Sequence, residues 1–146
     1  MNQFPSARIL FLLIAILSAA GIIDSAVALQ RHLAKSATTY CDFSEKINCD
    51  IVNRSEYSTL VGIPVALIGV GGYAAILALS TFLRSRVETP SQLLGTAIAG
   101  LAFALYLTYI EAYVLMTWCI LCVISLLLIV LISLSAVILK VKSATT

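Results

Sequence analysis

The chain contains four cysteines, arranged as two pairs of different spacing. Cys41 and Cys49 have seven residues between them in a polar stretch, whereas Cys119 and Cys122 form a Cys-x-x-Cys pair inside an apolar one. Such a pair at the start of a helix places both sulfurs within one turn, and the unpaired N–H groups there stabilise a thiolate. Thiol–disulfide exchange needs attacking and leaving thiols in series. The two pairs therefore predict a relay that passes electrons between thiols.

Three other interpretations of the cysteines remain open. Four thiolates can bind zinc, although zinc sites usually leave roughly two to four residues between paired cysteines. Free cysteines are often buried without a chemical role, and a disulfide between Cys41 and Cys49 can serve only to hold a loop. The occurrence of both pair types in one chain favours exchange chemistry, and we expect no metal.

The composition places the chain among membrane proteins. Apolar residues make up 61% of it, charged residues make up 11%, and the mean hydropathy is +1.06. Soluble domains carry about 25% charged residues. The net charge of +2 offers no electrostatic basis for binding nucleic acid. From the length we expect a single membrane domain, residues 1–146.

Long apolar runs predict the membrane-spanning helices, because crossing the hydrocarbon core takes about 20 residues. The run over residues 93–139 is about twice that length, so it must fold back as two helices. A removable signal peptide is the alternative for the first run, but its apolar region would be shorter. We predict an all-α integral membrane protein, a four-transmembrane-helix bundle with an extramembrane redox loop between helices 1 and 2. The expected helices cover residues 9–29, 59–83, 93–115 and 118–139, and the expected loop covers 30–58.

Basic residues predict the orientation in the membrane. Five lie on the side of both termini, and four lie in the long loop, where acidic residues dilute them. By the positive-inside rule both termini face the inside and both cysteine pairs face the outside, where disulfides persist. We expect a multi-pass protein of a bacterial inner membrane with its cysteines toward the periplasm. The endoplasmic reticulum membrane is the alternative.

Three further polar residues lie near the expected helix ends. Asp24 and Glu111 interrupt apolar runs, and an acid inside a membrane suggests a function. We favour a place at the membrane interface for both, since the cost of burying a charge is smaller there. His32 is expected to be a solvated interfacial residue, and a role in proton transfer is the alternative, because imidazole titrates near neutral pH.

The residues around the cysteines resemble the vitamin K epoxide reductase family, over roughly residues 8–139. The matching motifs are, in order, Cys41-Asp42, Cys49-Asp50-Ile51-Val52-Asn53-Arg54-Ser55, Gly62-Ile63-Pro64 and Trp118-Cys119-Ile120-Leu121-Cys122. The bacterial disulfide bond protein B family has its pairs in the reverse order. The ordered set of motifs therefore favours the first family over the second.

The resemblance implies a membrane thiol:quinone oxidoreductase that supports disulfide bond formation. Cys41 would meet a thioredoxin-like partner, and Cys49 would attack Cys119. Cys122 would lie against the electron acceptor, a quinone of the ubiquinone or menaquinone type. Ser55 matches a serine or threonine that the family places near the quinone, and a helix N-cap is its alternative role. The chain has no thioredoxin-like domain, so we expect the partner to act in trans.

Two positions differ from animal members of the family. Leu126 stands where those members carry a tyrosine, and residues 59–83 contain no asparagine to bind the quinone oxygen. We therefore expect a quinone as the acceptor, with reduction of vitamin K epoxide by the same cysteines as the alternative. An interpretation from another class is a non-enzymatic four-helix membrane scaffold with a structural loop disulfide.

Overall fold

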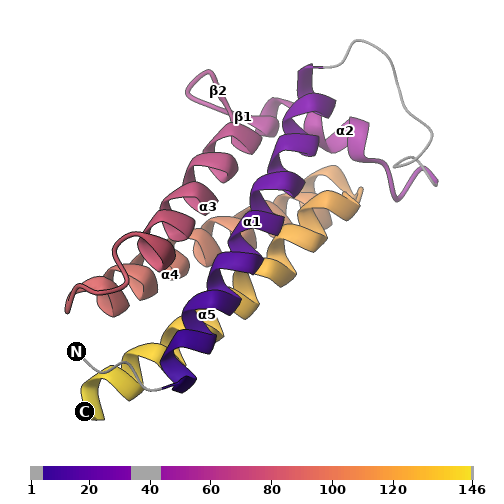
Figure 1. Cartoon of the computed structure of the whole chain (residues 1–146). Helices are drawn as coiled ribbons and strands as arrows, with labels where there is room; N and C mark the ends of the chain where they lie inside the picture. The colour runs from indigo at the N-terminus through magenta and orange to yellow at the C-terminus, as the bar shows by residue number, and fades with distance from the viewer. Residues whose placement is uncertain (1–4, 34–43, 146) are drawn as a thin grey trace.

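Four long helices lie side by side in the computed structural model, which describes residues 5–33 and 44–145 (Figure 1). They are α1 (Pro5–Leu33), α3 (Val65–Thr81), α4 (Thr89–Tyr109) and α5 (Ile120–Thr145), and α4 continues into the π-helical segment η2 (Ile110–Leu115). Between α1 and α3 lie the short helix α2 (Cys49–Asn53), the 3-10 turn η1 (Glu56–Ser58) and the strands β1 (Thr59–Leu60) and β2 (Ile63–Pro64). These short elements cover one end of the bundle. The start of α1 and the end of α5 lie together at the other end (Figure 1).

Three of the described helical segments are long and apolar enough to cross a membrane: Pro5–Leu33, Thr89–Leu115 and Ile120–Thr145. Helix α3 is also apolar but has 17 residues. At 1.5 Å per residue it is about 26 Å long, against a hydrocarbon core of about 30 Å. The chain is therefore a mostly helical, multi-pass membrane protein. The fourth crossing stays a prediction.

The helix expected over residues 59–83 is shorter in the structure, where it begins at Val65 and ends at Thr81. The preceding residues form an antiparallel hairpin in which Thr59 pairs with Pro64. Its turn holds Val61 and Gly62 at φ values of 54° and 82°, in the left-handed region that glycine adopts easily. The pattern of so short an apolar run fits both a hairpin and the first turns of a helix, so the sequence does not distinguish the two. The stretch 30–58, expected as a loop, also contains helical residues. They are the end of α1, the whole of α2 and the turn η1.

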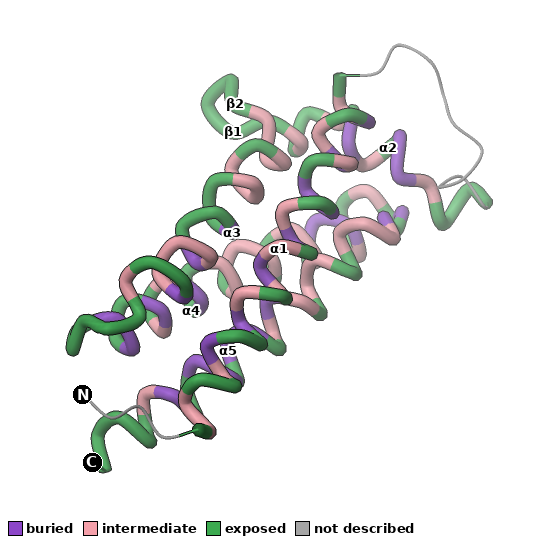
Figure 2. The backbone as a smooth tube through the Cα atoms, in the orientation of Figure 1, coloured by how far each residue is buried: buried purple, intermediate pink, exposed green. Residues whose placement is uncertain are grey.

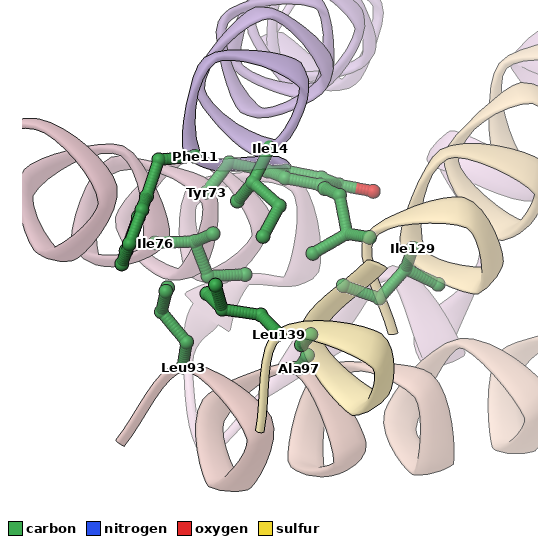
Figure 3. Packing of buried hydrophobic residues seen from close by; sticks show 10 residues of the cluster. Phe11, Ile14, Tyr73, Ile76, Leu93, Ala97, Ile129 and Leu139 are labelled. Carbon is green, nitrogen blue, oxygen red and sulfur yellow. The ribbon is translucent and has the colours of Figure 1, made fainter. Parts of the chain in front are cut away.

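Side chains from all four long helices form the core of the bundle (Figure 3). The labelled members are Phe11 and Ile14 of α1, Tyr73 and Ile76 of α3, Leu93 and Ala97 of α4, and Ile129 and Leu139 of α5. Many large apolar side chains point outward instead, and Figure 2 shows exposed positions recurring along each helix. Examples are Leu12, Ile16, Leu127 and Leu131. An apolar exterior of this extent suits contact with lipid.

Small residues bring α1 and α3 close together. A Cβ added at Gly21 would overlap the ring of Tyr73, and one added at Gly69 would lie 2.8 Å from the Oγ of Ser25. Glycine at such contacts is usual between membrane helices, because it lets the backbones approach. The Tyr73 hydroxyl donates a hydrogen bond to the carbonyl of Ser125 at 2.9 Å. One tyrosine thus joins α1, α3 and α5.

Candidate functional site

Three of the four cysteines lie in the described residues, at the bundle end covered by α2. Cys49 begins α2, Cys119 directly precedes α5, and Cys122 lies in the first turn of α5. Cys49 and Cys119 are both 0% exposed and belong to one packed cluster, which Val52, Ile120, Leu121 and Cys122 surround. Cys49 takes part in a disulfide, whereas Cys119 and Cys122 are free thiols. Cys41 lies outside the described residues.

Backbone hydrogen bonds hold the start of α2 against the segment before α5. The N–H of Asn48 donates to the carbonyl of Trp118 at 3.0 Å, and the N–H of Trp118 donates to the carbonyl of Lys46 at 2.7 Å. Asn48 also caps α2, since its Oδ1 accepts the N–H of Ile51 at 3.1 Å. This pairing brings Cys49 next to a cysteine that is distant in the sequence.

The side chain of Asn53 connects the two cysteine stations. Its Nδ2 donates to the carbonyl of Cys49 at 2.9 Å and lies 3.7 Å from the Sγ of Cys119, within hydrogen-bond range for sulfur. Asn53 is four residues after Cys49, which places both on one face of α2. The sequence interpretation gave Asn53 no role of its own. In the sequence, its spacing of four residues from Cys49 indicates that the two residues share a face of a helix.

Hydrogen bonding with Cys122 lowers the pKa of Cys119 below the ordinary value of a thiol. Burial opposes this effect, because it disfavours the charged thiolate. The backbone N–H groups of Cys122 and Leu121, at the start of α5, lower the pKa further. This is the position that the Cys-x-x-Cys spacing predicts for the thiolate. A thiolate is therefore easier to form on Cys119 than on an ordinary thiol.

Glu111 lies beside both free thiols. It is in η2 and 2% exposed, and its Oε2 accepts the backbone N–H of Cys119 at 3.1 Å. Its carboxyl group also interacts electrostatically with Cys119 and Cys122. We expected Glu111 and Asp24 at the membrane interface. Both are enclosed by the protein, because helix packing buries the faces that carry them. Their depth in the membrane stays a prediction.

A cavity of about 340 Å³ lies between the long helices and is closed at one end by α2 and η1. Its walls are mostly apolar side chains, and the volume falls in the range of about 300–1,000 Å³ that is usual for small-molecule sites. Cys122 lines this cavity, whereas Cys49 and Cys119 do not. Other polar residues in its wall include His32, Asn53, Ser55, Ser58 and Glu111.

Ser55 and His32 both form hydrogen bonds within the wall of the cavity. Ser55 occupies the N-cap position of η1 but makes no capping bond there, because its hydroxyl donates to the carbonyl of Val52 at 2.8 Å. The Nδ1 of His32 lies 2.6 Å from the carbonyl oxygen of Asn53 and 3.2 Å from the Oγ of Ser58. A carbonyl only accepts, so Nδ1 carries the hydrogen. His32, which is half-buried, is thus bonded into the cavity wall.

A helical membrane protein with free paired thiols beside an apolar cavity is the class that this fold and site define. A model of the vitamin K epoxide reductase family matches residues 12–137, which is most of the chain. The chain belongs to the vitamin K epoxide reductase family, as the ordered cysteine motifs indicated. The family carries out membrane oxidoreductase chemistry on thiols, disulfides and quinones in general.

Proposed function

We propose that the protein is a membrane thiol:quinone oxidoreductase that supports disulfide bond formation. The observation that carries the proposal is the division of the Cys-x-x-Cys pair: Cys119 packs against Cys49, while Cys122 lines the cavity. Each sulfur of the pair thus faces one of the two reactants. The loop pair delivers electrons on one side, and a quinone accepts them on the other.

Electrons pass through the cysteines by disulfide exchange. A reduced thioredoxin-like protein, acting in trans from outside the membrane, reduces the pair Cys41 and Cys49. The Cys49 thiolate attacks Cys119 in a Cys119–Cys122 disulfide and releases the thiol of Cys122. Cys41 then attacks Cys49 and releases Cys119 as a thiolate, which the Asn53 amide stabilises. The described state, with Cys49 oxidised and the other pair reduced, is the one ready to donate electrons to a quinone.

The cavity suits a quinone in size and chemistry. A quinone headgroup is a flat, apolar ring with two oxygens that accept hydrogen bonds, and apolar pockets with a few placed polar groups bind such molecules. Three of the polar residues that line this cavity lie at its α2 end: His32 near the end of α1, Ser55 directly before η1, and Ser58 in η1. Ser55 is therefore the residue we place near the quinone, together with Cys122.

The test is quinone reduction by the purified protein. It is supplied with ubiquinone or menaquinone and a reduced thioredoxin-like donor, and the quinone absorbance is followed. We expect turnover by the intact protein, and unchanged absorbance would reject the proposal. Supplying vitamin K epoxide in place of the quinone measures the alternative activity directly, and the scaffold alternative predicts no turnover with either acceptor.

Two serine variants separate the roles of the Cys-x-x-Cys pair. Cys122→Ser should abolish quinone reduction, because the Cys119–Cys122 disulfide can no longer form, and should leave part of the protein as a Cys49–Cys119 mixed disulfide, which only Cys41 can resolve. Cys119→Ser should abolish both turnover and the mixed disulfide. Mass spectrometry of alkylated protein without reductant detects the difference. Full turnover by Cys119→Ser would reject the role given to that thiol.

A further inference from the structure

The carboxyl group of Glu111 has an oxygen that the disulfide relay leaves without a role. Oε2 is occupied by the backbone N–H of Cys119, but Oε1 is buried and makes no hydrogen bond to any described residue. The residue is 2% exposed and lines the cavity. Buried polar atoms are nearly always hydrogen-bonded, because leaving one unpaired costs free energy. An exception beside a reactive pair therefore points to a functional reason.

The carboxyl group of Glu111 lies beside the thiols and in the wall of the cavity. The Cys122 thiol lies close enough to interact with the carboxyl group, and both residues line the cavity. Glu111 is in the π-helical segment η2, and π-helical turns in proteins occur frequently at functional sites. Glu111 is therefore within reach both of a proton leaving Cys122 and of an acceptor held in the cavity.

The other ionisable groups in the cavity wall are less suited to this task. Of the described residues, they are Asp24, His32, Tyr57 and Tyr73. The Nδ1 of His32 is bonded to the carbonyl of Asn53, and the Tyr73 hydroxyl is bonded to Ser125. Asp24 is eight residues before His32 on α1, or roughly 12 Å farther from the α2 end. Glu111 is the one among the five that is hydrogen-bonded to the Cys-x-x-Cys pair.

We propose that Glu111 carries the proton of the Cys122 thiol to the acceptor in the cavity. The proposal rests on the proposed function, in which that acceptor is a quinone. When the pair is oxidised, the Cys122 S–H bond breaks, a bond forms between the Cys119 thiolate and Cys122, and the two electrons reduce the quinone. The proton passes from the Cys122 thiol to Oε1 of Glu111 and then to a quinone oxygen. The second proton comes from water, which took up the proton of the Cys41 thiol when Cys119 was released as a thiolate, so that thiolate, thiol, quinone and one proton give disulfide and hydroquinone.

The first test is the variant Glu111→Gln. The amide oxygen still accepts the N–H of Cys119, but the amide cannot carry a proton. The variant therefore keeps the structural role of Glu111 and removes its role in proton transfer. We expect quinone reduction to fall by about 10²-fold or more, the magnitude of general acid–base catalysis. The melting temperature and the yield of the Cys49–Cys119 mixed disulfide in the Cys122→Ser background should not change. Glu111→Asp should restore part of the rate, since it restores an ionisable group.

A matched control removes an acid from the other end of the same helix. Glu88 is exposed at the N-cap of α4, so Glu88→Gln should keep the turnover of the unaltered protein. The pH–rate profile of Glu111→Gln should lose one limb. Asp24→Asn removes the other carboxyl group of the cavity, and its profile should keep that limb. The groups that face Glu111 and also titrate are Cys119 and Cys122. Normal rate and pH profile in Glu111→Gln would overturn the proposal.

The second test detects protonation of Glu111 in the absence of a quinone. The Cys119–Cys122 pair of the unaltered protein is oxidised with a soluble disulfide reagent, and the infrared difference spectrum is recorded. We expect a carbonyl band of a protonated carboxyl group to change, and Glu111→Gln to lack that change. No such band in the unaltered protein would overturn the proposal. If the band changes but no quinone is reduced, the proposed acceptor is wrong and the proton role of Glu111 stands.

Discussion

The Nδ2 of Asn53 lies 3.7 Å from the Sγ of Cys119 while it donates to the carbonyl of Cys49 at 2.9 Å. One amide thus contacts both cysteine stations across 66 positions of sequence. Because Nδ2 is a donor, it stabilises a thiolate on Cys119 better than a thiol. Asn53 therefore does more than support α2: it favours the form of Cys119 that leaves in disulfide exchange.

Asn53→Ala should slow electron transfer from the loop pair to the Cys-x-x-Cys pair by about 10-fold. A hydrogen bond to a charged group contributes about 1.5–3 kcal/mol, and part of it is recovered from the neighbouring N–H groups. Asn53→Asp should slow transfer further, because a negative charge would face the thiolate. Single-turnover exchange with a reduced donor measures the rate. Asn48→Ala is the control, since it removes the cap of α2 but not the donor to sulfur, and equal slowing in both alanine variants would contradict the role of Asn53.

Cys122→Ala should raise the pKa of Cys119, because the hydrogen bond with Cys122 is the largest cause of its lowering. A lowered pKa keeps the Cys119 thiolate present at lower pH, and exchange slows as the pH falls through that pKa. In the alanine variant this loss should occur at higher pH. Cys122→Ser, which keeps a hydroxyl donor, should show a smaller change. Ultraviolet absorbance of the thiolate against pH measures both, and an unchanged midpoint in Cys122→Ala would contradict the assigned cause.

Gly21→Ala should destabilise the bundle by about 1–3 kcal/mol, the usual cost of forcing an extra carbon into a packed interior. Its Cβ would overlap the Tyr73 ring and push α1 away from α3. Gly71→Ala is the matched control, because nothing lies within 4 Å of its added Cβ and alanine favours a helix over glycine. Thermal unfolding in detergent compares the two. Similar melting temperatures would show that the α1 and α3 contact relaxes freely.

His32→Leu should weaken quinone binding more than it slows the chemical step. The change removes the donor to the Asn53 carbonyl and the contact with Ser58, so a buried acceptor is left unpaired at a cost of about 1–3 kcal/mol. We expect KM for the quinone to rise about 10-fold with a smaller change in kcat. His32→Gln, which retains an N–H donor, should recover part of the affinity. A variant with lowered kcat and unchanged KM would place His32 in the chemistry instead of the cavity wall.

The sequence by itself determined the class of protein and the family, and it predicted which cysteines form the reactive pairs. These are local or additive properties: hydropathy sums along a run, and the Cys-x-x-Cys spacing fixes a one-turn geometry wherever the helix lies. The helices over 9–29, 93–115 and 118–139 were located because long apolar runs leave few other structures in lipid. The hairpin before Val65 was missed because its residues are as apolar as the helix that follows.

Only the tertiary structure decided what surrounds the cysteines. Glu111 and His32 are single polar residues whose partners lie on other elements, and Asn53 reaches Cys119 in addition to Cys49 of its own helix. The contacts with other elements are not assigned by the neighbouring sequence. The division of the Cys-x-x-Cys pair between a buried cluster and a cavity depends on how the segment before α2 pairs, at Ile47, with Trp118. Such contacts arise when packing excludes water and the backbone must satisfy its hydrogen bonds across the chain. That is why the spacing of the cysteines predicted a relay, but the folded bundle was needed to separate the thiol that meets Cys49 from the one that lines the cavity.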